Sequence, residues 1–144
     1  MTAPVSASPT ILLLSTSDTD LITARACGAR YLWANPSRLV EGELEELLQG
    51  ADVAIVRILG GYRAWESGVD AVVASGVPAV VVSGEQAPDA DLMNHSTTPA
   101  GVALQAHIYL AQGGTTNLAN LHAFLSDTVS VSYTHLTLPT TPYV

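Results

Sequence analysis

Short, continuous runs of apolar residues alternate with amphipathic segments through the first 83 residues, and this alternation restricts the possible folds. The predicted strands are residues 11–15, 31–34, 52–59 and 77–82, and the predicted helices between them are residues 19–27, 43–48 and 63–74. Strands without polar alternation are typical of a sheet that is covered on both faces, which is a parallel sheet. We therefore predict an α/β fold with a doubly wound, mostly parallel four-stranded sheet of flavodoxin-like (Rossmannoid) order, followed by helices.

The 144 residues suffice for one ordinary domain. We expect a flexible leader over residues 1–10, an α/β domain over residues 11–112, and the start of a further, truncated helical segment over residues 113–129. Helices are expected at about residues 99–111 and 117–126, because Gly113 and Gly114 separate two apolar periodic segments.

Residues 130–144 differ in character from the preceding chain. The run VSYTHLTLPT, residues 131–140, has no helical period and resembles the translated adaptor of transposon-based sequencing libraries. We expect that the end of a sequencing read cut the reading frame near Val129, so that the protein's true C-terminus is missing, and we exclude the tail, including His135, from functional arguments.

Charge excludes several classes of partner. The chain has 13 acidic residues, five arginines and no lysine, for a net charge of -8. Binding to nucleic-acid phosphates or to an anionic membrane requires clustered cations, so neither partner is expected. A Walker A loop requires a lysine, so any ATP chemistry is expected outside this segment.

Only 12% of the residues are charged, against about 25% in typical domains. A surface covered by other protein explains this, and so does a genome of high GC content; the composition fits both. The sole cysteine, Cys27, is interpreted as a small core residue. A signal peptide and a membrane-spanning run are both missing from the sequence, so we expect a cytoplasmic protein.

Polar loops follow three of the predicted strands. Ligands of open parallel sheets bind beyond the carboxyl ends of the strands, where glycine amides and hydroxyl groups can approach an anion. The candidate substrate-lining residues are Ser15, Thr16, Arg57, Gly60, Gly61, Ser83, Gly84 and Glu85. The alternative is that these residues form ordinary strand-to-helix turns with an internal ion pair, as in every fold of this class.

Arg57 lies within a predicted buried strand, where a charge is costly unless it is paired. We expect it to reach Glu85 or Asp18, or to meet a carboxylate of the substrate.

No catalytic residue and no metal site is predicted in this segment. His95, His107 and His122 lack the spacing of metal ligands and are expected to be surface or half-buried helix residues. The loop from Gly84 to Asp89 is only a weak candidate for a cation.

Several motifs, in order and without large gaps, resemble the N-terminal region of the cobaltochelatase large subunit (CobN), a family that also includes the magnesium chelatase H subunit. They are ILLLSTSDTD (11–20), ANP (34–36), ADVAIVRILGG (51–61), AWE (64–66), ASGV (74–77), SGEQAPDAD (83–91), ST (96–97), PAGV (99–102), YL (109–110), GG (113–114), NL (117–118) and FLSDTV (124–129).

The resemblance implies ATP-dependent insertion of Co²⁺ into hydrogenobyrinic acid a,c-diamide, a corrin precursor, in aerobic cobalamin biosynthesis. It implies that the large subunit holds tetrapyrrole and metal while AAA+ and von Willebrand A-type (VWA) subunits hydrolyse ATP with Mg²⁺. The expected partners are these subunits, the corrin substrate and the remainder of the subunit's own chain. This segment is expected to bind no cofactor and to be inactive by itself.

Two other functions remain open at this point. A stand-alone flavodoxin-like module for a small ligand fits the three polar loops, and a non-catalytic interaction domain fits the low charge.

Overall fold

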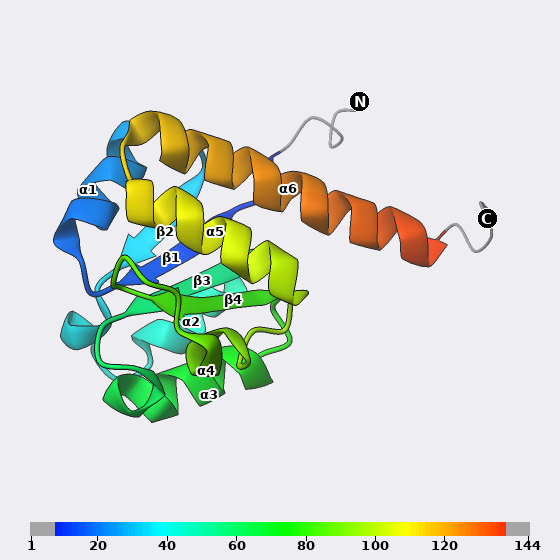
Figure 1. Ribbon diagram of the computed structural model, residues 1–144. Coiled ribbons are helices and arrows are strands. Elements are labelled where there is room, and N and C mark those ends of the chain that lie inside the picture. Colours follow the sequence, from blue (N-terminus) through cyan, green and yellow to red (C-terminus); the bar gives the residue numbers. More distant parts are fainter. Residues whose placement is uncertain (1–7, 138–144) are drawn as a thin grey trace.

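A four-stranded parallel sheet forms the centre of the molecule (Figure 1), as the computed structural model, which describes residues 8–137, shows. The strands are β1 (Ile11–Ser15), β2 (Tyr31–Ala34), β3 (Val53–Ile58) and β4 (Ala79–Ser83), in the order β2-β1-β3-β4. The predicted α/β fold with a doubly wound parallel sheet is confirmed.

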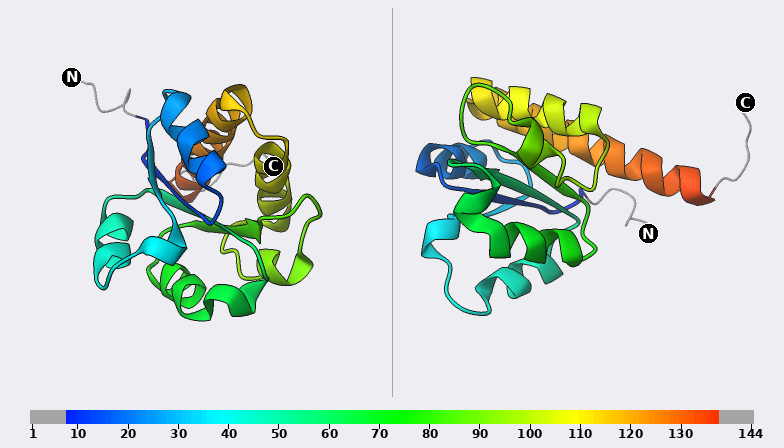
Figure 2. Two further views of the ribbon diagram at one scale, coloured as in Figure 1. Left: turned by 90° about the vertical axis from the view of Figure 1, so that its left-hand side faces the viewer. Right: turned by 60° about the horizontal axis from the view of Figure 1, so that its bottom comes forward.

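Helices cover both faces of this sheet (Figures 1 and 2). They are α1 (Asp18–Ala26), η2 (Pro36–Arg38), α2 (Glu43–Gln49), η3 (Tyr62–Trp65), α3 (Glu66–Ala74), α4 (Ala90–Met93), α5 (Ala100–Gln112) and α6 (Thr115–Thr137). Helices α1, α5 and α6 pack on one face, and α2, α3 and α4 pack on the other. Because successive strand residues point to opposite faces, both halves of each apolar run are buried, which explains why the runs are continuous.

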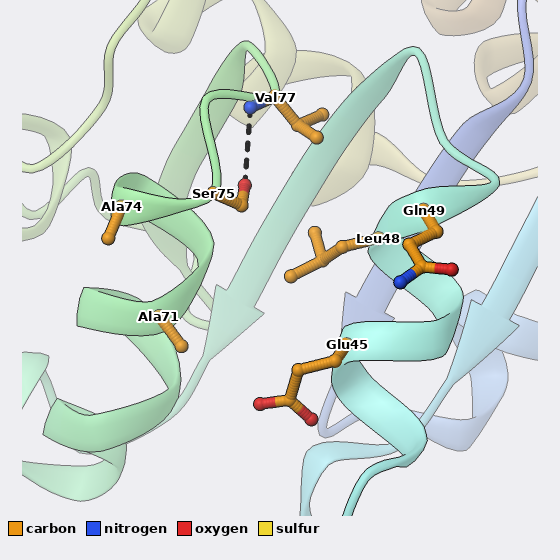
Figure 3. Close-up of a pocket in the computed structure, with 7 residues that line it drawn as sticks. All are labelled: Glu45, Leu48, Gln49, Ala71, Ala74, Ser75 and Val77. Carbon is orange, nitrogen blue, oxygen red and sulfur yellow. Dashed lines mark hydrogen bonds between the residues drawn. The ribbon is translucent and has the colours of Figure 1, made fainter.

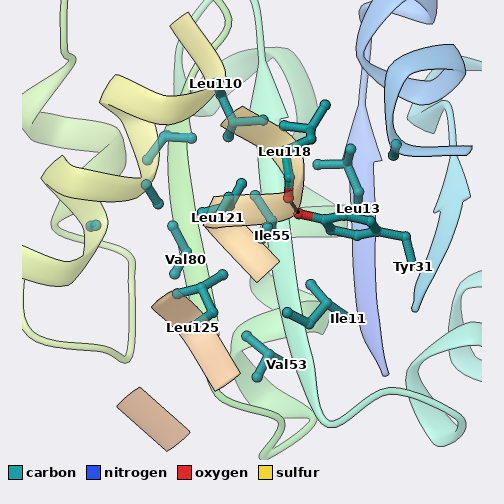
Figure 4. Close-up of a cluster of buried hydrophobic side chains, with 14 of the residues drawn as sticks. Ile11, Leu13, Tyr31, Val53, Ile55, Val80, Leu110, Leu118, Leu121 and Leu125 are labelled. Carbon is teal, nitrogen blue, oxygen red and sulfur yellow. Dashed lines mark hydrogen bonds between the residues drawn. The ribbon is translucent and has the colours of Figure 1, made fainter. Parts of the chain in front are cut away.

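The core on the α1, α5 and α6 side joins the sheet to the C-terminal helices (Figure 4). Leu13 of β1 and Ile55 of β3 are fully buried there, beside Leu121 of α6. The hydroxyl of Tyr31 donates a 2.7 Å hydrogen bond to the carbonyl of Leu118. Burial raises the pKa of this phenol, and Cys27 raises it further. Leu118, Leu121 and Leu125 of α6 therefore pack into the same core as α1 and α5.

The end of α6 differs from the sequence prediction. The helix was expected to end near Ser126, but it continues through Thr137. Its continuation has a physical reason: residues 127–137 contain neither glycine nor proline, and Pro139 is the first residue that stops a helix. Of the predicted leader and tail, residues 1–7 and 138–144 lie outside the described part of the chain.

Two of the three histidines expected at or near the surface are buried. His107 is 2% exposed and His122 is 5% exposed. The Nε2 of His122 lies 3.1 Å from the carbonyl oxygens of both Pro9 and Arg30. This contact ties the residues before β1 and β2 to α6, so Pro9, which the sequence placed in a flexible leader, is hydrogen-bonded to the domain.

Candidate functional site

The carboxyl ends of β1, β3 and β4 bring most of the predicted residues together. The strand register places Ser15 beside Arg57, and Ile58 beside Ser83. Ser15, Arg57 and Ser83 are each buried to 95% or more. A polar group in this position must find partners within the protein, because water does not reach it.

The guanidinium of Arg57 forms hydrogen bonds with groups inside the domain. Its Nη1 donates to Oδ1 and Oδ2 of Asp20 at 3.0 and 2.8 Å. Its Nε donates to the carbonyl of Ser83 at 3.1 Å, and its Nη2 donates to the carbonyl of Gly84 at 3.3 Å. The guanidinium thus joins α1 to the loop after β4, and the internal ion pair considered from the sequence is present.

The partner of Arg57 differs from the residues expected. Asp20 takes this position, and neither Asp18 nor Glu85 does. The hydroxyl of Ser15 also donates to Oδ2 of Asp20 at 2.8 Å. A sequence signal for Asp20 existed, because Asp20 and Ala24 are four residues apart on the helix face that is buried against the sheet.

Asp18 instead points outward and pairs with Arg38 of η2. Its carboxylate also accepts a 3.1 Å hydrogen bond from the side chain of Asn35. The Arg38 contact, followed by the Asn35 hydrogen bond, holds the pKa of Asp18 below its ordinary value. The first turn of α1 thus carries one buried and one exposed carboxylate, both near the positive end of the helix dipole.

An open pocket of about 510 Å³ lies at the same edge of the sheet. Its lining residues are Gly60, Gly61, Ser83, Glu85, Ala87, Pro88, Asp89 and Ala90. Four of the predicted residues are among them, while Thr16 is not. Thr16 lies in the β1–α1 turn, where its amide donates to the carbonyl of Arg57 at 3.2 Å.

The pocket contains acidic groups and backbone atoms. Glu85 is exposed, and Asp89 accepts a 3.1 Å hydrogen bond from the amide of Leu92. None of the residues that line the pocket is cationic, and the guanidinium of Arg57 is paired with Asp20. By charge, the pocket suits an amide or a hydroxyl group better than a carboxylate. That these residues line a substrate stays a prediction.

The loop beyond Gly61 is held by an aromatic stack. The Tyr62 ring lies on the His95 ring with centroids 4.1 Å apart. The Tyr62 hydroxyl donates to Oδ1 of Asp70 at 2.7 Å, and this hydrogen bond raises the pKa of Tyr62 to about 12.

A second pocket, of about 290 Å³, lies between α2 and α3 (Figure 3). It is lined by Glu45, Leu48, Gln49, Ala71, Ala74, Ser75 and Val77. These residues lie at the carboxyl ends of the two helices and before β4, so the pocket is at the opposite edge of the sheet from the predicted site. Its lining is mainly apolar and includes none of the predicted residues.

Within residues 8–137, no three His, Cys, Asp or Glu side chains are grouped as a metal site would require. In the same part of the chain, no helix combines the length and the apolar character needed to cross a membrane.

Comparison with known proteins gives one informative relative. No family model matches the chain, and no curated protein matches it. Among solved structures, the catalytic subunit of cobaltochelatase from Mycobacterium tuberculosis matches with a TM-score of 0.85 and 66% sequence identity. The match covers 87% of this chain but only 11% of that subunit. In sequence and in fold, this chain is therefore related to a segment of a cobaltochelatase catalytic subunit.

Proposed function

We propose that this chain is the N-terminal region of the tetrapyrrole-binding large subunit, of the CobN type, of a cobaltochelatase. The proposed reaction is the ATP-dependent insertion of Co²⁺, a substrate, into hydrogenobyrinic acid a,c-diamide in the cytoplasm. The observation that carries the proposal is the 66% identity, at a TM-score of 0.85, to a cobaltochelatase catalytic subunit. This identity over 87% of the chain is far higher than a shared fold alone requires.

Within the intact subunit, this domain would serve as a rigid support and not as the catalytic centre. The buried contacts of Arg57 with Asp20, Ser83 and Gly84 fix the start of α1 relative to the loop that follows β4. A fixed edge can present backbone groups to a bound tetrapyrrole without rearrangement. The absence of lysine from the whole chain agrees with ATP hydrolysis by separate AAA+ and VWA-type subunits.

A chimera tests this proposal. Residues 8–129 replace the matched segment of the M. tuberculosis subunit, and cobalt insertion into the a,c-diamide is followed by absorbance with ATP, Mg²⁺ and the partner subunits. We expect the chimera to insert cobalt at a rate within about tenfold of the parent, whereas the 144-residue chain alone inserts none. A chimera that is folded by circular dichroism but inactive contradicts the proposal.

Sequencing provides an independent check. The source DNA downstream of the Val129 codon is resequenced with a library chemistry that lacks the transposon adaptor. The proposal expects an open reading frame that continues for a large-subunit length. A stop codon within a few residues contradicts it.

The pocket of about 510 Å³ favours a second candidate function, a stand-alone binding module for a small ligand. Isothermal titration calorimetry of the 144-residue chain with nucleotides and cobamides separates the two. Micromolar binding that Gly61→Leu abolishes supports the module. No heat with any ligand excludes the module for these two ligand classes.

A further inference from the structure

The outer face of α5 is apolar and uncharged. Leu104 and Ile108 are one helical turn apart and are 40% and 39% exposed. The opposite face of the helix, with Ala106 and Leu110, is buried against the sheet and α6. Two large aliphatic side chains thus lie on one outward stripe of a helix whose inner face already has a core.

Charge is distributed unevenly among the helices. From Pro99 to Val129, which includes α5 and most of α6, the only charged residue is Asp127. About a quarter of residues are charged in a typical domain, so seven or eight are expected in this segment. The opposite layer, α2 and α3, carries Glu43, Glu45, Glu46, Glu66 and Asp70. The low charge of the chain is thus concentrated in α5 and α6 and does not extend to α1, α2 or α3, whereas a compositional bias alone would have affected all the helices.

We propose that the outer face of α5, defined by Leu104 and Ile108, packs against the remaining polypeptide of the cobaltochelatase subunit. This inference rests on the proposed function. The chain corresponds to only 11% of the solved relative, so most of that subunit lies outside the matched segment and is available to cover this face. The acidic layer requires solvent or cations, whereas the α5 face can be buried without desolvating a charge.

The size of the face favours a tethered partner over a second copy. A stable dimer buries about 800 Å² per partner, which two partly exposed aliphatic side chains do not supply. A segment of the same polypeptide docks intramolecularly at a high effective concentration, so a small patch suffices.

Cysteine labelling tests the inference in the chimera described above. Leu104→Cys and Ile108→Cys are each introduced, with Val40→Cys as an exposed reference and the same three variants of the 144-residue chain as the control for intrinsic differences in exposure. Val40 is a 68% exposed aliphatic residue beside the acidic layer. Maleimide labelling is followed peptide by peptide by mass spectrometry. Relative to Cys at position 40, we expect Cys at positions 104 and 108 to react at least about tenfold more slowly in the chimera than in the 144-residue chain.

Rates within about threefold at all three positions overturn the inference. Protection that weakens on dilution of the chimera identifies a second copy as the occupant and also overturns it. If the chimera does not fold, cysteines at the aligned positions of the M. tuberculosis subunit provide the same comparison. Cobalt insertion by the chimera is measured separately, so an active chimera with unprotected cysteines refutes the docking and leaves the proposed function intact.

Discussion

The buried ion pair between Arg57 and Asp20 makes a quantitative prediction. The two side chains are 6% and 9% exposed, so removing one leaves the other as a charge without its partner in a dry environment. Breaking such a pair typically costs about 3–5 kcal/mol. Asp20→Ala also removes the acceptor of the Ser15 hydroxyl, so we expect a loss at the upper part of this range.

Urea unfolding, monitored by tryptophan fluorescence and circular dichroism, measures this loss. With a slope of about 2 kcal/mol per molar urea, the midpoint falls by about 2 M. The free energy of unfolding of a domain is about 5–15 kcal/mol. If that of the parent chain is near ~5 kcal/mol, the Asp20→Ala variant would be unfolded before urea is added. Asp20→Asn keeps the side-chain shape and serves as the milder variant.

A double-mutant cycle separates pairing from packing. Arg57→Met removes the charge but leaves the carbonyl oxygens of Ser83 and Gly84 without their donor. Because the double variant Asp20→Ala/Arg57→Met no longer contains an unpaired charge, its loss should be smaller than the sum of the single losses by about 1–3 kcal/mol. Asp18→Ala, at the exposed pair, is the control and should leave the midpoint unchanged. Single losses below about 1 kcal/mol, or strict additivity, would refute the reasoning.

Three further predictions concern other sites. A Cβ on Gly68 would lie 1.9 Å from the Trp65 ring, so Gly68→Ala should lower the free energy of unfolding by about 1–3 kcal/mol. In a Trp65→Ala background the clash is absent, and the same substitution should raise the free energy of unfolding by up to about 1 kcal/mol; urea unfolding measures both. Asp70→Ala should lower the pKa of Tyr62 from about 12 toward 10, measured by NMR titration; because the folded-state pKa is raised, the stabilisation by this hydrogen bond is complete below pH 10 and is lost as the pH rises through 12. Tyr31→Phe removes a buried hydrogen bond to α6 and should cost about 1 kcal/mol; an unchanged midpoint would contradict this.

The sequence alone was sufficient for the sheet and for most of the helices. Residues 11–15 and 53–58 form strands that are buried on both faces, and such strands need apolar residues at nearly every position. The continuous apolar runs in the sequence therefore predict them. The resemblance of the motif set to cobaltochelatase agrees with the solved relative, a cobaltochelatase catalytic subunit. The sequence also indicated that Arg57 needed a partner, within the protein or on a substrate, because a buried guanidinium is not stable without one.

Only the tertiary structure decided which partner Arg57 takes and which loop residues meet. Asp18 and Asp20 are two residues apart, and the phase of α1 against the sheet turns Asp20 inward and Asp18 toward Arg38. The burial of His107 and His122 depends on carbonyl oxygens of distant segments, which no local pattern specifies. Local periodicity reports which face of a helix or strand is apolar. The partners of a side chain in distant segments are set by tertiary packing, which only the folded chain defines.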